Sequence, residues 1–183
     1  GYTDVISLVK NDYPSVASCG TAITEPQVAL MSRFTNNVVL WMDGDSAGIK
    51  ATARAIPLFL AKGFIVKIAT TSASDPDAYF TDQKKDLVEV DWMEWAYQHH
   101  VPQDGTPTDL AQGIREVEEY IQQLPFELDQ RLYKKKLKEL SGIEEQPITI
   151  EETKEAISTL KGKQNWTYYC ELRERLGLAH SPD

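Results

Sequence analysis

The stretch VVLWMDGDSAGIKATARAIPLFLAKGFIVKIA, residues 38–69, decides the fold. Residues 38–42 form an apolar run without alternating polar side chains, which is typical of a strand buried on both faces. Residues 47–62 carry apolar side chains at helical spacing, and Gly63 is a typical helix stop. Residues 65–69 are a second short apolar run. A strand, a helix and a strand in this order predict a right-handed parallel crossover in an α/β sheet.

The segments before this stretch continue the same alternation. Residues 4–10 have a helical pattern with Asp4 as a candidate N-cap, and residues 16–18 are a short strand candidate. Thr24 and Gln27 form a capping box that opens a further predicted helix.

Beyond about residue 90 the pattern becomes helical. Apolar stripes, capping boxes and glycine stops predict four helices, at residues 110–124, 128–140, 149–160 and 166–176. We therefore expect an α/β part over residues 1–90 and an α-helical bundle over residues 91–183, with the loop at 103–107 as a candidate boundary between subdomains.

Composition excludes several classes of protein. The chain has 183 residues and a formal charge of −9, and the acidic excess argues against nonspecific nucleic-acid binding by a basic surface. Its apolar runs are far shorter than the ~20 residues of a membrane span, and no secretory signal is visible. Cys19 and Cys170 do not make a disulfide scaffold, so a reducing cytosol is the expected compartment.

Two pairs of aspartates follow successive predicted strands. Asp43 and Asp45 come after the first, Asp75 and Asp77 come after the second, and Asp4 is expected at the same edge, just past what would be an earlier strand. Neighbouring strands lie about 4.8 Å apart, and the loops after parallel strands gather at the carboxyl edge of a sheet. Five carboxylates in one place repel one another, so some must protonate unless a cation neutralises them, and such hard oxygen ligands suit Mg²⁺ or Mn²⁺.

Small residues beside the first pair favour a phosphate site. Gly44 allows a close turn, and Gly48 lets a ligand approach the start of a helix, whose free N–H groups attract anions. Lys50, one turn into that helix, is a candidate phosphate contact. The alternatives are a solvated turn plus a helix cap for the Asp-Gly-Asp motif and a solvated helix residue for Lys50. His99 and His100 have no neighbours at zinc-ligand spacing.

Four segments resemble the Toprim segment of bacterial DnaG-type DNA primases in order and spacing: Gly1-Tyr2-Thr3-Asp4-Val5, Gly20-Thr21-Ala22-Ile23-Thr24, Asp43-Gly44-Asp45-Ser46-Ala47-Gly48 and Asp75-Pro76-Asp77. Arg131-Leu132-Tyr133 carries a fainter resemblance to the helical bundle of the primase core. The resemblance implies a Toprim-like parallel sheet flanked by helices and followed by an α-helical bundle. Thr70-Thr71-Ser72-Ala73-Ser74 departs from the family's usual Leu-Pro-Asp-Gly-like loop.

The resemblance also implies synthesis of short RNA primers from NTPs on a single-stranded DNA template, at the bacterial replisome and beside a replicative helicase. It implies two-metal nucleotidyl transfer, in which one ion lowers the pKa of the primer 3′-hydroxyl and the other neutralises the leaving pyrophosphate. The implied site comprises three sets of residues: catalytic Asp43, Asp45 and Asp4; metal-binding Asp43, Asp45, Asp75 and Asp77; and phosphate-binding Gly44, Gly48 and Lys50.

The family places a glutamate directly before the Gly-Tyr pair, and that position lies ahead of Gly1. The family's basic N-terminal half and its zinc-binding domain also have no counterpart here, so zinc is expected only in a missing N-terminal domain. We therefore expect residues 1–183 to be a fragment, truncated at its N-terminal end, that is inactive by itself.

Two rival interpretations stay open. A Toprim phosphodiesterase of the topoisomerase or nuclease type would cut strands instead of incorporating NTPs, although no tyrosine nucleophile is obvious. A non-catalytic replication module would dock a helicase or another partner through its helical half. The second rival predicts that Asp43→Ala and Asp75→Ala leave partner binding and cellular function unchanged.

Overall fold

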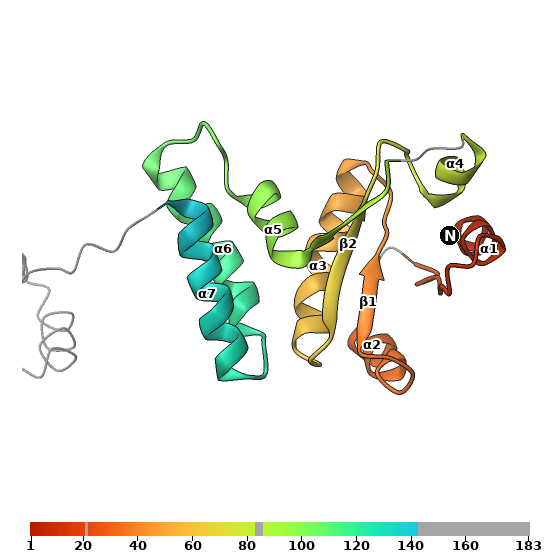
Figure 1. Cartoon of the computed structure of the whole chain (residues 1–183), viewed down its shortest axis with the longest axis horizontal. Coiled ribbons are helices and arrows are strands. Elements are labelled where there is room, and N and C mark those ends of the chain that lie inside the picture. Colours follow the sequence, from red (N-terminus) through yellow and green to blue (C-terminus); the bar gives the residue numbers. More distant parts are fainter. Residues whose placement is uncertain (21, 83–85, 143–183) are drawn as a thin grey trace, which may run out of the picture. The chain divides into compact units, whose positions relative to one another are not determined.

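A computed structural model describes residues 1–20, 22–82 and 86–142. Its elements are, in chain order, α1 Tyr2–Lys10, α2 Glu25–Met31, β1 Asn37–Leu40, α3 Ser46–Leu60, β2 Ile65–Thr70, α4 Pro76–Thr81, β3 Val88–Asp91, α5 Trp92–His100, α6 Pro107–Gln122 and α7 Glu127–Ser141 (Figure 1). Residues Gly1–Ser141 form one compact unit. The helices predicted at 149–160 and 166–176 lie outside the described residues, and the boundary predicted at residue 90 stays a prediction.

The predicted crossover from strand to helix to strand is confirmed. β1 and β2 are parallel neighbours in register Val38↔Val66 and Leu40↔Ile68, with α3 between them in the chain. Gly63 has a φ of +74°, the left-handed conformation that ends a helix and that glycine adopts without strain. The Thr24 backbone N–H donates to Gln27 Oε1 at 2.9 Å, so the predicted capping box also forms.

The predicted parallel sheet is present in β1 and β2, and a third strand makes the sheet mixed: the order is β1-β2-β3, and β3 runs antiparallel to β2. The connection after β2 explains the direction. α4 has six residues and spans only about 9 Å, so it does not carry the chain back along the strand, and β3 starts from the end at which β2 finishes.

Two smaller predictions are wrong. Residues 16–18 form no strand, and Val16 is 72% exposed. The run at residues 38–42 is not buried on both faces, because Leu40 is buried whereas Val39, on the other face of β1, is 44% exposed. Asp4 lies in the first turn of α1.

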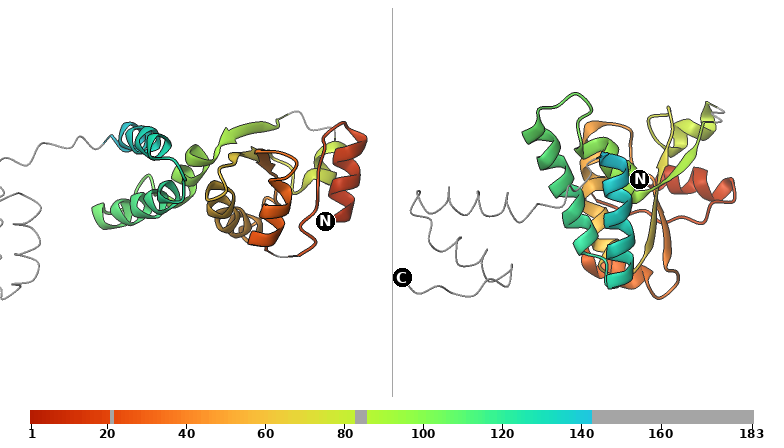
Figure 2. Two further views of the ribbon diagram at one scale, coloured as in Figure 1. Left: turned by 90° about the horizontal axis from the view of Figure 1, so that it is seen from below. Right: turned by 60° about the vertical axis from the view of Figure 1, so that its left-hand side comes forward.

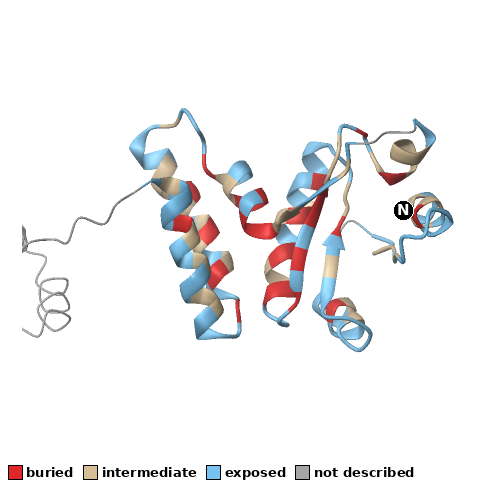
Figure 3. Ribbon diagram, viewed as in Figure 1, coloured by how far each residue is buried: buried red, intermediate tan, exposed pale blue. Residues whose placement is uncertain are grey.

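The core lies between the sheet and the helices α3, α5, α6 and α7 (Figures 1 and 2). Its largest fully buried side chains come from all of these layers except α7 and include Ile56, Phe59, Val66, Trp92 and Ile121. The buried positions follow the inner faces of these elements, whereas their outer faces are exposed (Figure 3). No helix in the described parts of the chain combines the length and apolar character of a membrane crossing.

α7 packs on the start of α5 through a half-buried tyrosine. Tyr133 Oη donates to Asp91 Oδ2 at 3.0 Å, and its ring lies against Trp92 with the centroids 4.7 Å apart. Burial, followed by the charge of Asp91, raises the pKa of Tyr133 to about 12. Lys136 Nζ adds an ion pair with Glu94 at 2.8 Å. These contacts hold α7, which carries the apolar stripe predicted at residues 128–140, against the end of β3 and the start of α5.

Candidate functional site

The loops that follow β1 and β2 meet at the carboxyl edge of the parallel strands. The backbone N–H of Gly44 donates to the carbonyl of Ser74 at 2.8 Å and joins the two loops directly. The sheet therefore brings the segment that carries Asp43 and Asp45 beside the segment that carries Asp75 and Asp77.

One aspartate of each pair caps a helix. Asp45 Oδ1 accepts the N–H of Gly48 at 2.7 Å at the start of α3. Asp75 Oδ1 accepts the N–H of Ala78 at 2.7 Å at the start of α4, and its other oxygen accepts Ser74 Oγ at 2.9 Å. The hydrogen bonds from Ala78 and Ser74 lower the pKa of Asp75. One oxygen of each carboxylate therefore caps a helix. For Asp45, a helix cap is part of the alternative interpretation of the Asp-Gly-Asp motif.

The pKa of Asp43 is raised, in contrast to that of Asp75. Partial desolvation raises its pKa first, and repulsion from Asp4, Asp45 and Asp75 raises it further. Asp4 is hydrogen-bonded to the amino group of Gly1. Three of the other four predicted acidic side chains thus repel the charge of Asp43.

Asp77, the fifth, points elsewhere. Its Oδ1 accepts a hydrogen bond from Ser7 Oγ and so connects α4 to α1. These two helices pack on each other beside the sheet. Its Oδ2 is not used by this hydrogen bond, so the predicted metal role of Asp77 stays a prediction.

A cavity of about 180 Å³ lies beside Asp43. It is lined by residues from the end of β1 and its loop, from α3, from β2 and its loop, and from the second half of α5: Trp41, Met42, Asp43, Gly44, Ile49, Thr52, Ile68, Ala69, Thr70, Thr71, Ala73, Trp95 and His99. Asp43 and Gly44 thus line a hollow at the strand ends, and their predicted metal and phosphate roles stay predictions. Lys50 is exposed on α3 and is not part of the lining, so its phosphate role stays a prediction.

Gly48 has a structural reason to be glycine. A Cβ atom at this position would lie 1.9 Å from the carbonyl oxygen of Asp43. The space in front of Gly48 is therefore filled by the chain itself, and α3 starts in direct contact with the Asp43 backbone. Through this contact the helix fixes the position of Asp43 at the cavity.

The acidic cluster fits a hard divalent cation in its chemistry. Within the described residues, no three histidine, cysteine or acidic side chains are arranged as a ready metal centre. Mg²⁺, however, is held in proteins by one or two carboxylates while it keeps several waters. The mutual repulsion around Asp43 is the feature that such a cation would relieve.

Sequence reasoning missed Asp86, which holds the loop after β2. Its carboxylate accepts Thr71 Oγ1 at 2.7 Å and the N–H of Ser72 at 2.6 Å. These bonds lower its pKa to about 2. It also missed His99 and Trp95, which reach the cavity from α5, because no local pattern tells which helix covers a strand end.

Asp86 gives the fold a pH dependence. Because its pKa is lowered in the folded state, its contribution to stability is complete above the ordinary aspartate value of about 3.9 and is lost as the pH falls through about 2. We expect Asp86→Asn to be less stable than the wild type at pH 7 and nearly equal to it at pH 2. Urea unfolding at both pH values measures this, and a difference that stays constant with pH would contradict it.

Comparisons with known proteins identify the class first. Residues 1–80 match a family model described as Toprim-like, and this is the segment that carries both parallel strands and all five aspartates. The chain thus contains a Toprim-like α/β segment flanked by helices.

Similarities over three quarters of the chain or more then point to DNA primases. A DNA primase of Clostridium acetobutylicum is 33% identical over 161 residues, which cover 81% of this chain and 26% of that protein. The structure of the DnaG catalytic core aligns with a TM-score of 0.64 at 26% identity, over 79% of this chain and 51% of the other. A DnaG primase catalytic domain bound to ssDNA aligns with a TM-score of 0.59 at 26% identity, over 75% and 48% of the two chains.

The resemblance to the DnaG-type primase catalytic core is therefore confirmed. The chain spans only 18–29% of the length of four curated DNA primases that it matches.

Proposed function

We propose that this chain is the Toprim segment of a DNA primase that synthesises short RNA primers on single-stranded DNA. The observation that carries the proposal is the cavity beside Asp43 at the carboxyl ends of two parallel strands, within a segment similar to primase cores. The substrates would be NTPs, the products RNA primers, and the setting the replisome in the bacterial cytoplasm, beside the replicative helicase.

In this proposal Asp43, Asp45, Asp75 and Asp77 hold Mg²⁺ or Mn²⁺, and Asp4 completes the catalytic acids. The bound ions would supply activation of the primer hydroxyl and neutralisation of the leaving pyrophosphate. The chain contributes position: Asp45 and Asp75 are fixed as helix caps, and Gly48 keeps α3 against the Asp43 backbone. Gly44 and Lys50 are the proposed phosphate-binding residues, whereas Gly48, also predicted for this role, has its N–H bonded to Asp45 and the Asp43 backbone in front of it.

The matched relatives favour priming over the two rivals, because the curated proteins that align with this chain are DNA primases. Priming by residues 1–183 alone is not part of the proposal, since these relatives are several times longer than the chain.

A chimera tests the proposed activity. Residues 1–183 would replace the matching segment of the Clostridium acetobutylicum DNA primase, which is 161 residues long in the alignment. We expect template-dependent incorporation of labelled NTPs on single-stranded DNA, lost in the Asp43→Asn form of the same chimera. The unmodified relative serves as the positive control.

Strand scission by the chimera in place of NTP incorporation would support the phosphodiesterase rival. Equal incorporation with and without Asp43→Asn would remove the catalytic role of the acidic cluster and favour the non-catalytic module.

A further inference from the structure

His99 lies in the last turn of α5 and lines the same cavity as Asp43. We propose that His99 binds a phosphate oxygen of the nucleotide that enters this cavity. The inference deepens the proposed function and rests on it. It assigns to a histidine of the helical part the phosphate contact that the sequence alone predicts for Lys50.

The His99 ring is held in a fixed position. Its Nδ1 lies 2.8 Å from the carbonyl oxygen of Trp95, and its ring stacks on the buried Trp95 indole with the centroids 4.1 Å apart and the planes at 22°. A carbonyl only accepts hydrogen bonds, so Nδ1 must donate. This leaves Nε2 as the second nitrogen, and it has no hydrogen-bond partner within the described residues.

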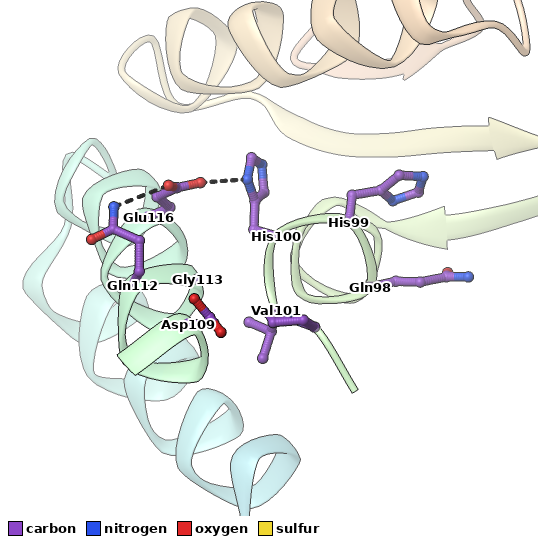
Figure 4. A pocket seen from close by; sticks show the side chains of 9 residues that line it. Gln98, His99, His100, Val101, Asp109, Gln112, Gly113 and Glu116 are labelled. Atoms are coloured by element: carbon purple, nitrogen blue, oxygen red, sulfur yellow. Dashed lines mark hydrogen bonds and ion pairs between the residues drawn. The ribbon is translucent and has the colours of Figure 1, made fainter. Parts of the chain in front are cut away.

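The neighbouring histidine shows the contrast. His100 Nδ1 lies 2.7 Å from Glu116 Oε2, and its Nε2 lies 3.2 Å from Tyr120 Oη, so both of its nitrogens are used inside the protein. In Figure 4 the His100 ring points toward Glu116, whereas the His99 ring extends from another side of α5. The pocket of about 320 Å³ drawn there lies between α5 and α6, and His99 lines both this pocket and the cavity beside Asp43.

The charges of the side chains that line the cavity also favour His99 as the phosphate contact. Among the described residues that line it, His99 is the only side chain able to carry a positive charge. The three lining threonines donate their hydroxyl protons elsewhere: Thr52 to the Gly48 carbonyl, Thr70 to the Val88 carbonyl and Thr71 to Asp86.

A cation is also favoured at this place in the fold. His99 is in the last turn of a helix, where the helix dipole stabilises positive charge. A protonated ring would keep its bond to Trp95 and offer the Nε2 proton to an anion as a charge-assisted hydrogen bond. The cavity could then hold a phosphate through two contacts. One is a divalent cation that the phosphate shares with Asp43, and the other is the hydrogen bond from His99.

Binding of inorganic triphosphate in the presence of Mn²⁺ tests the inference on the 183-residue chain. Triphosphate has no base or sugar, so only phosphate contacts are measured, by calorimetry. We expect His99→Phe, which keeps an aromatic ring on Trp95, to weaken triphosphate binding about tenfold, as loss of one hydrogen bond between charged groups does. Binding of Mn²⁺ alone should not change. His99→Arg should restore triphosphate binding, because a guanidinium stacks on aromatic rings and binds phosphate.

His100→Phe is the matched control, and we expect it to bind triphosphate as the wild type does. Wild-type affinity in His99→Phe, or failure of His99→Arg to restore binding, would overturn the inference. The same holds if the wild type binds Mn²⁺ but no triphosphate. None of these outcomes tests whether the acidic cluster binds metal. A wild type that does not bind Mn²⁺, by contrast, would contradict the proposed function itself.

Discussion

Replacing Asp43 and Asp75 together by asparagine is expected to weaken Mn²⁺ binding by at least about a hundredfold, since changes that only surround a metal ligand already cost 10–100-fold. The variant removes two formal charges from a cluster in which Asp4, Asp45 and Asp75 repel the charge of Asp43. It should fold normally. Asparagine is as good a helix N-cap as aspartate, so the start of α4 at residue 75 is kept. Isothermal calorimetry with Mn²⁺ measures the effect.

The control must change the net charge equally without touching the cluster. Asp104→Asn combined with Glu119→Gln does so at two exposed positions, one in the loop before α6 and one on α6. We expect the control to bind Mn²⁺ like the wild type. If the two double variants bind Mn²⁺ equally, the acidic cluster is not the metal site, and Asp45 and Asp75 are helix caps only.

The parts of the fold that local chemistry decides could be predicted from the sequence. The apolar runs of β1 and β2, the helix between them and its end at Gly63 depend on patterns a few residues long. β3 could not be found in this way. It has only four residues and leads directly into α5, so its pattern merges with the helical one that follows. Its direction depends on the length of α4 and not on its own residues.

The candidate site likewise contains some residues that short sequence patterns predict and others that they do not. Asp43 and Gly44 were predictable because parallel strands place the loops that follow them at one edge. The rest of the cavity comes from residues that are distant in sequence, such as Trp95 and His99. Their place depends on how α5 packs against β2, which no short pattern encodes. The burial of β1 was predicted wrongly for the same reason, since it depends on which elements cover each face.

Gly48→Ala is expected to destabilise the protein by about 1–3 kcal/mol, the usual cost of forcing a methyl group into a packed site. The sign is unusual, because alanine normally stabilises a helix relative to glycine by about 0.5–1 kcal/mol. At this position the new Cβ would lie 1.9 Å from the Asp43 carbonyl oxygen, and backbone cannot move aside as a flexible side chain can. Urea unfolding gives the stability change.

Relief of that clash requires α3 or the Asp43 backbone to shift, so the same substitution should also weaken Mn²⁺ binding, and the two effects should appear together. Gly20→Ala is the control, because a Cβ there meets no atom of the described residues within 4 Å and neither property should change. A Gly48→Ala protein that is more stable than the wild type and binds Mn²⁺ as tightly would mean that α3 does not position Asp43. If stability falls but Mn²⁺ affinity does not, the contact supports the fold without tuning the site.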